Sequence, residues 1–393
     1  MNFGSLLAGN ILYRGLNIAT GMLITALFTR LMGAQGYGVL SLLVANVSVF
    51  SLISCLGSES GITFHYASGS LNREKIFTII YLVIFFQLAF LTAIELIHHQ
   101  FTGQYWLVGG KEIKFLLWGL LYLFSVTVID KYKAFLNASH RYTLANEIIF
   151  FSNLISLTAV GSFFFFSEQK DILFYLQIFI GAGFLQALLL AITFHIVTKQ
   201  RIQFVKTGRS AYKLFFSYSF LVLITNVIQF FAYRVDYWLV HYFKGNEALG
   251  LYSLAVRLGQ LFWALPLLFA SIIFPMMADK EKNYDETKLL ALIRTTNAIS
   301  FIAMLAATAL AGWVIPFVFG EGFKGSVRPF LYLLPGLFLF SINIMLASYF
   351  AAKNRLMVNF TGSVICLLLV LALDLWLIPI IGIEGAAIAS SVA

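Results

Sequence analysis

Long apolar segments follow one another along almost the whole chain, with short polar connectors between them. A segment of roughly 20 apolar residues is long enough to cross a bilayer as a helix. The strands of a membrane barrel would alternate apolar and polar positions over roughly ten residues, and these segments do not alternate. We therefore expect helical spans at residues 6–28, 37–56, 76–97, 115–136, 144–166, 172–197, 214–233, 249–276, 289–319, 330–351 and 356–378.

A further apolar segment begins near Gly385, close to the end of the sequence at Ala393. The nine residues of this segment make about 14 Å of helix, against a hydrocarbon core of about 30 Å. A half-helix that ended in lipid would leave its last carbonyl groups without hydrogen bonds. We therefore expect an all-α, polytopic helical membrane protein with about twelve transmembrane helices, of which the last is truncated.

The composition excludes several other classes of protein. Of the 393 residues, 60% are hydrophobic and only 11% are charged, whereas about 25% of a soluble domain is charged. A soluble enzyme and a single-span receptor do not fit this count. The net charge is +9, but the basic residues are spread between apolar segments. That distribution favours membrane orientation and an anionic lipid substrate over nucleic acid.

Alternate connectors differ in their content of Lys and Arg: one set holds fifteen and the other seven. Because these residues concentrate in cytoplasmic connectors, the bias predicts a cytoplasmic N-terminus. The most basic connector, KQRIQFVKTGRSAYK at residues 199–213, separates the sixth and seventh spans. We interpret it as the linker between an N-terminal six-helix lobe, residues 1–205, and a C-terminal lobe, residues 206–393, which is incomplete at its twelfth helix.

An internal repeat with an offset of 212 residues supports this division. Six spans per half is an even number, so both halves enter the membrane from the same side and form parallel repeats, a design found in transporters. The third and fourth spans fall on the ninth and tenth at the same offset. The matching residues are Gly33, Gly38, Ser41 and Leu42 in the first half and Gly245, Gly250, Ser253 and Leu254 in the second.

Four stretches, in this order, resemble one known family: RLMGAQGYGVLSL, DYWLVHYFKGNEALGLYSLAVRL, IPFVFGEGFKGSVRPFLYLLPG and GIEGAAIAS. They are similar to stretches of the bacterial polysaccharide (O-antigen-type) flippases of the multidrug/oligosaccharidyl-lipid/polysaccharide (MOP) exporter superfamily. The resemblance covers essentially the whole chain. It implies a two-lobed carrier of twelve to fourteen helices that moves undecaprenyl-pyrophosphate-linked oligosaccharides outward across the inner membrane.

Arginines inside the apolar spans are the most informative residues. An ionisable group costs roughly 2.5–3.5 kcal/mol at mid-membrane and therefore tends to face a cavity or a partner. In the first span, Asn10, Arg14 and Asn17 share one helical face at i, i+4 and i+7. A guanidinium grips a pyrophosphate bidentately, so this face is a candidate surface for an anionic head group.

The seventh span carries a matching polar face with Asn226, Gln229, Tyr233 and Asp236. At the repeat offset, Asn226 corresponds to Arg14 and Gln229 corresponds to Asn17. Such faces would line a central lumen from both halves, or their amides would hydrogen-bond between helices. The candidate substrate-binding residues are Arg14, Asn17, Asn226, Gln229, Asp236, Arg257 and Gln260.

Other polar residues have simpler interpretations. Arg257 and Gln260, in the eighth span, fit either the lumen or an ion pair with Asp236, whereas Arg294 lies near a cytoplasmic end and is expected to snorkel. We expect Asp374 to be an interfacial carboxylate next to the aromatic anchor Trp376. Glu95, near His98 and His99 at an outer edge, leaves a role in proton coupling open.

The chain has no phosphate-binding loop of the P-loop type and no His-Glu-x-x-His helix. We therefore expect no cofactor, no enzymatic activity, and energy drawn from an ion or substrate gradient. The expected partners are the polyprenyl-pyrophosphate-linked oligosaccharide and membrane lipids, with a polysaccharide polymerase and a chain-length regulator as candidate protein partners and no nucleic acid.

Two other functions fit a chain of this size. A cation-coupled drug antiporter of the same superfamily needs acidic groups in the lumen, and the first span supplies Arg14 without an acid. A membrane polysaccharide polymerase or ligase is expected to keep a large extracytoplasmic loop. The longest such connector here, residues 98–114, is too short to build a catalytic site.

Overall fold

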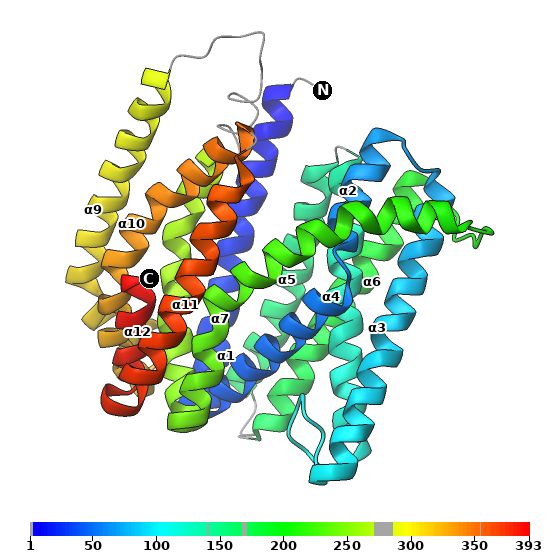
Figure 1. The fold of residues 1–393 in the computed structure, drawn as a ribbon. Helices are drawn as coiled ribbons and strands as arrows, with labels where there is room; N and C mark the ends of the chain where they lie inside the picture. The colour runs from blue at the N-terminus through cyan, green and yellow to red at the C-terminus, as the bar shows by residue number, and fades with distance from the viewer. Residues whose placement is uncertain (1–2, 140, 167–170, 271–285, 354) are drawn as a thin grey trace. The chain divides into compact units, whose positions relative to one another are not determined.

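The computed structural model describes residues 3–139, 141–166, 171–270, 286–353 and 355–393 (Figure 1). All regular elements in these ranges are helices, and nine of the helices described there are long and apolar enough to cross a membrane. The expected all-α, polytopic architecture is thereby confirmed. The elements are α1 (Phe3–Ser54), α2 (Ser58–Ser68), α3 (Arg73–Thr102), α4 (Ile113–Ala138), α5 (Tyr142–Phe166), α6 (Ile172–Thr198), α7 (Arg209–Gly259), η1 (Gln260–Trp263), α9 (Glu286–Phe319), η2 (Glu321–Ser326), α10 (Val327–Ala352), α11 (Leu356–Ile381) and α12 (Ile383–Val392).

The chain forms two compact units, and its two longest helices each contribute to both. The first unit is Met1–Met32 with Leu43–Val227, and the second is Gly33–Leu42 with Ile228–Ala393. The second unit therefore includes a short piece of α1, and α7 passes into it after residue 227. The lobe boundary that we expect at residues 205 and 206 stays a prediction.

Both long helices bend at the glycines that the sequence repeat relates. We expected α1 to be two spans joined by a connector, but it is one helix in which Gly33 alone has a non-helical backbone, with φ 64° and ψ −177°. Gly245 interrupts α7 in the same way, with φ 82° and ψ −174°. That backbone region is accessible essentially only to glycine, so one residue is enough to redirect the helix and no connector is needed.

Directly after each bend, the two repeat segments cross within the second unit. A Cβ on Gly38 would lie 1.8 Å from the Asn246 carbonyl oxygen, and a Cβ on Gly250 would lie 1.9 Å from that of Ala34. Beyond this close approach, the hydroxyls of Ser41 and Ser253 are 2.8 Å apart and hydrogen-bonded. The crossing is nearly symmetric, which confirms the repeat at the matched positions.

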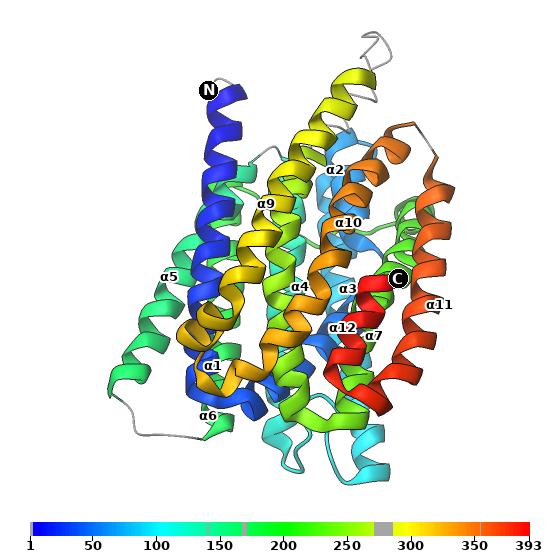
Figure 2. The same ribbon diagram turned by 90° about the vertical axis from the view of Figure 1, so that its left-hand side faces the viewer.

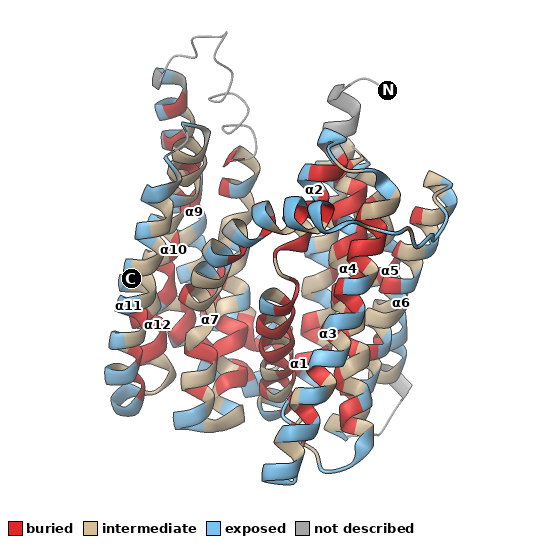
Figure 3. Ribbon diagram, turned by 45° about the vertical axis from the view of Figure 1, so that its right-hand side comes forward, coloured by how far each residue is buried: buried red, intermediate tan, exposed pale blue. Residues whose placement is uncertain are grey.

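In the first unit, α4 packs against α2, α3 and α6, and Figure 3 shows buried residues all along it. An aromatic cluster fills the contact: the rings of Phe77 and Phe135 stack with centroids 4.4 Å apart, and Phe194 of α6 packs on both. Helix α4 also buries a charge, because the side chain of its Lys131 has no solvent exposure.

In the second unit, α10 packs against α9, α11 and α12. Figure 2 shows α9 and α10 lying side by side. The short helix α12 is attached to α10 by a hydrogen bond of 2.8 Å, which the Gly336 N–H donates to the Ser391 hydroxyl. The last residues of the span expected at 249–276, residues 271–276, lie outside the described residues.

Candidate functional site

The first unit holds the candidate residues of the first span, and they have different surroundings. The side chain of Arg14 is exposed on α1. The Asn17 amide donates to the Asn146 carbonyl on α5 at 3.0 Å, and the Asn146 amide donates to Asn10 Oδ1 at 2.6 Å. The amides therefore tie α1 to α5 in the manner of interhelical hydrogen bonds in membrane proteins, while the guanidinium is left available.

The matching positions of α7 are more open. Asn226 is exposed at the end of the first unit, and Gln229 is exposed at the start of the second. The Gln229 amide donates to the Tyr233 hydroxyl one turn further along the same helix, at 3.0 Å. These two side chains form no hydrogen bond to another helix among the described residues, in contrast to Asn17, the repeat counterpart of Gln229.

Two arginines of the second unit lie near a pair of tyrosines. The Arg234 guanidinium lies over the Tyr237 ring, 4.7 Å from its centroid, and Arg257 is exposed. Both arginines lie within electrostatic range of Tyr37 and Tyr237. Gln260, expected beside Arg257, is half-buried in η1. The second unit thus gathers two cations next to aromatic and amide groups.

Asp236 faces the interior of the second unit, where it forms several hydrogen bonds. It is buried, its Oδ1 accepts from the Tyr237 N–H at 2.9 Å, and its Oδ2 accepts from the Tyr252 hydroxyl. The Ser390 hydroxyl of α12 also donates to Oδ2, at 3.3 Å. An acceptor with this many donors is held in one orientation.

Asp374 on α11 is the carboxylate for which the sequence interpretation was wrong. We expected it at the membrane interface, but it has no solvent exposure, whereas Trp376 is 64% exposed. Residues two apart lie about 200° apart around a helix, so the exposed aromatic anchor requires that the carboxylate point inward. Neither Asp374 oxygen has a hydrogen-bond partner among the described residues.

The two buried carboxylates of the second unit belong together. Asp374 lies close enough to Asp236 and Tyr252 for their charges to interact. A buried charge that is not paired carries a high free-energy cost. A site that brings two carboxylates together, one without donors, is chemically suited to take up a proton or a small cation.

Glu95 has a structural role instead. Its two carboxylate oxygens accept the backbone N–H groups of Trp106 and Leu107, at 2.7 and 2.9 Å. The side chain is buried and holds the connector between α3 and α4 in place. Because both oxygens bind backbone donors, this carboxylate is poorly placed to carry protons.

The fold and these charged groups define a polytopic helical membrane protein with two internally repeated, glycine-bent helices, exposed arginines in its spans and a buried acid pair. Residues 27–328 of the sequence match the polysaccharide biosynthesis protein family. The chain belongs to that family, which confirms the resemblance noted from its motifs.

Solved structures with the same fold include transporters of the MOP superfamily. The lipid II flippase MurJ, in an inward closed conformation, is 16% identical with a TM-score of 0.75, covering 97% of this chain and 84% of that one. An inward-facing MATE-family multidrug resistance transporter is 13% identical with a TM-score of 0.68, over 96% and 90%. A mutant of the Vibrio cholerae MATE transporter VcmN is 14% identical with a TM-score of 0.64, over 99% and 93%. No curated protein sequence matched the chain.

Proposed function

We propose that the protein is a flippase that moves polyprenyl-pyrophosphate-linked oligosaccharide repeat units from the cytoplasmic to the outer leaflet of a bacterial inner membrane, for cell-surface polysaccharide synthesis. A polymerase that joins the repeat units and a chain-length regulator are its proposed partners there. The family match and the fold shared with the lipid II flippase support this proposal. The observation that carries it is the exposure of Arg14 and Arg257 on helices that are long and apolar enough to cross a membrane.

The arginines provide the chemistry that the head group requires. A pyrophosphate is anionic, and a guanidinium can bind its oxygens bidentately. Arg14 lies in the first unit and Arg257 in the second, so each unit carries one candidate cation for the head group. In this mechanism the two units alternate in exposing the bound head group to the two sides of the membrane, and the polyprenyl tail stays in lipid.

The acid pair of the second unit is the proposed coupling site. Asp374 is fully buried, and its oxygens have no hydrogen-bond partner among the described residues, while Asp236 is fixed by Tyr252 and Ser390. Entry of a proton or a monovalent cation would neutralise this charge. The state of the pair would therefore favour one arrangement of α7, α11 and α12 over another.

A cation-coupled drug antiporter is the second candidate, and the same acid pair is the observation that favours it. A drug antiporter must hold a cationic substrate as well as the coupling ion. Asp236 and Asp374 are both buried and too enclosed to hold a molecule of that size. Among the candidate substrate residues the exposed charges are Arg14 and Arg257, which suits an anionic passenger with a small coupling cation.

The test is transport of a fluorescent polyprenyl-pyrophosphate-linked sugar by purified protein in liposomes. Each charge-assisted hydrogen bond to the phosphates contributes about 1.5–3 kcal/mol, so we expect Arg14→Gln and Arg257→Gln each to lower transport about tenfold or more. Arg294→Gln, an exposed arginine near the start of α9, is the matched control and should transport normally. Transport at the wild-type rate by a variant that combines Arg14→Gln with Arg257→Gln would refute the proposed role of these arginines.

A further inference from the structure

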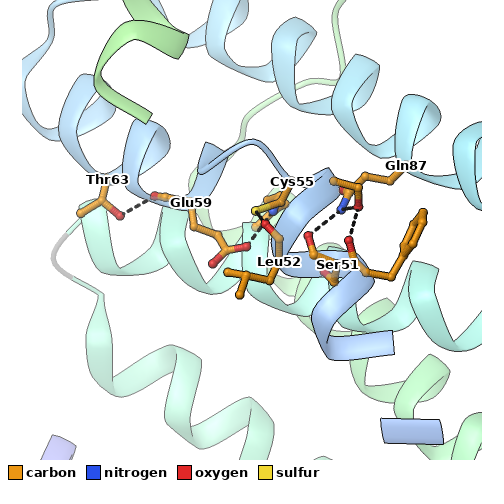
Figure 4. Close-up of polar contacts among 9 residues, drawn as sticks. Ser51, Leu52, Cys55, Glu59, Thr63 and Gln87 are labelled. Carbon is orange, nitrogen blue, oxygen red and sulfur yellow. Dashed lines mark hydrogen bonds and ion pairs between the residues drawn. The ribbon is translucent and has the colours of Figure 1, made fainter. Parts of the chain in front are cut away.

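The first unit contains a polar pocket between α2 and α4 that the substrate residues proposed above do not use. The cavity has a volume of about 840 Å³, within the range of roughly 300–1,000 Å³ that is typical of ligand sites. Figure 4 shows Glu59 and Thr63 on neighbouring turns of α2. We refer to this cavity as the α2–α4 pocket. Its principal lining residues are Glu59, Thr63, Phe64, Asp130, Lys133 and Asn137.

The pocket is formed by two facing helical stripes. On α4, Asp130, Lys133 and Asn137 recur at i, i+3 and i+7 and therefore share one face. On α2, Glu59 and Thr63 are one turn apart, and Phe64 follows with 45% of its surface exposed. A polar stripe in an otherwise apolar bundle is costly unless its groups have partners, so the charges around these two stripes determine what the pocket can bind.

The charges of the pocket balance one another. Glu59 accepts a hydrogen bond of 2.8 Å from Lys131, whose side chain is fully buried behind it. Asp130 lies within electrostatic range of Glu59 as well as of Lys131 and Lys133. Counted together with Lys131 behind the lining, the two carboxylates are matched by two ammonium groups, so this cluster has no net formal charge with which to select a phosphate or a metal ion.

The remaining chemistry fits a neutral ligand rich in hydroxyl groups. Carboxylates accept hydrogen bonds, the lysine donates them, and the hydroxyl and amide groups of Thr63 and Asn137 do both. The Phe64 ring packs edge-on against His65, with centroids 5.0 Å apart, and its remaining exposed surface adds an apolar patch to the lining. Donors, acceptors and one apolar patch beside a charge cluster without net formal charge are the features that recognise a carbohydrate.

We infer that the α2–α4 pocket binds the glycan of the transported lipid while the arginines bind its pyrophosphate. This inference rests on the proposed function. The connectors that follow α2 and α4 belong to the basic set that the positive-inside rule assigns to the cytoplasm, which is the side from which the glycan would enter. The pocket would therefore distinguish among glycans before translocation.

The experiment measures binding to purified protein in lipid nanodiscs. The probes are lipid-linked oligosaccharide extracted from cells lacking the gene, undecaprenyl pyrophosphate without sugar, and the glycan released from the extract by mild acid. Asp130→Asn and Phe64→Leu remove a charge and the ring, respectively. Glu112→Gln and Phe85→Leu are matched controls at exposed positions of the first unit outside the pocket.

We expect each pocket variant to bind the glycan-bearing lipid about tenfold more weakly and undecaprenyl pyrophosphate as wild type does, with both controls unchanged. Equal loss for the two lipids, or no loss for either, would overturn the inference. Free glycan that bound wild type as tightly as the intact lipid would identify a soluble sugar as the ligand, which would also overturn it. Wild-type protein that bound neither lipid would refute the proposed transport function as well, whereas equal binding of both lipids by wild type and by the pocket variants would refute only the glycan site.

Discussion

Each unit of the protein buries a charge centre, and the two centres are built in opposite ways. In the first unit, fully buried Lys131 meets Glu59 at 2.8 Å. In the second, fully buried Asp374 lies near another carboxylate, Asp236, and its oxygens have no hydrogen-bond partner among the described residues. The first centre is complete as it stands, whereas the second needs a proton or a cation from outside.

This difference separates a structural charge from a functional one. Removing one member of a complete buried pair leaves an uncompensated charge and lowers stability strongly. Removing one member of an incomplete pair relieves an electrostatic cost and should mainly affect whatever binds there. The same kind of substitution should therefore have opposite consequences in the two units.

The largest expected effect is on the complete centre. Glu59→Gln leaves the fully buried ammonium group of Lys131 without its partner and should lower the free energy of unfolding by about 3–5 kcal/mol. Denaturant unfolding in detergent micelles measures this difference.

Glu112→Gln is the matched control in the same unit. Glu112 pairs with Lys114 at 2.9 Å, but the two side chains are 68% and 42% exposed, so its loss should cost no more than about 1 kcal/mol. Equal losses for the two variants would show that burial of the lysine does not distinguish these pairs. Addition of Lys131→Met to Glu59→Gln should restore part of the lost stability.

The next effect concerns cation binding at the incomplete centre. If the ligand is a cation, wild-type protein should unfold at a higher temperature in sodium chloride than in choline chloride of equal ionic strength. If the ligand is a proton, the unfolding temperature should rise as the pH is lowered. At a concentration one hundred times its Kd, a ligand adds about 2.7 kcal/mol of stability. Asp374→Asn should fold and lose this response.

Glu247→Gln, at an exposed carboxylate of α7 in the second unit, should keep the wild-type response. Thermal unfolding of the three proteins in each salt and at each pH gives the comparison. A response to cation or proton that survives in Asp374→Asn would remove the acid pair from the coupling mechanism.

The helical spans and the repeat could be predicted because both depend on local or self-similar sequence. Runs of apolar residues define spans without any knowledge of neighbours, and Gly33 and Gly245 matched at a fixed offset. What the sequence did not predict was that each glycine bends a continuous helix, because a break of one residue and a short connector leave the same apolar pattern.

The charge centres were harder to predict because their partners are distant in the chain. Glu59 and Lys131 are 72 residues apart, and nothing local to either one indicates the pairing. For Asp374 a local signal existed: an exposed aromatic anchor two residues later places the carboxylate on the opposite helical face. Arg14 and Arg257 came from helical-face arguments, and their contact with substrate stays a prediction.

The smallest expected effect tests the charge state of Asp236. Tyr252 donates a hydrogen bond to this carboxylate from within the same helix. Tyr252→Phe should cost about 1.5–3 kcal/mol if the acceptor is ionised and about 0.5–1.5 kcal/mol if it is neutral. We expect the larger loss in choline chloride at neutral pH, because Asp236 has three hydrogen-bond donors while Asp374 has none.

Tyr242→Phe is the control for this prediction. Tyr242 is 80% exposed on the same helix, so its substitution should have no measurable effect on the free energy of unfolding. A loss no larger in choline chloride than at a pH low enough to protonate the pair would show that Asp236 is already neutral, and the charge that a cation would offset would then have to reside on Asp374 alone.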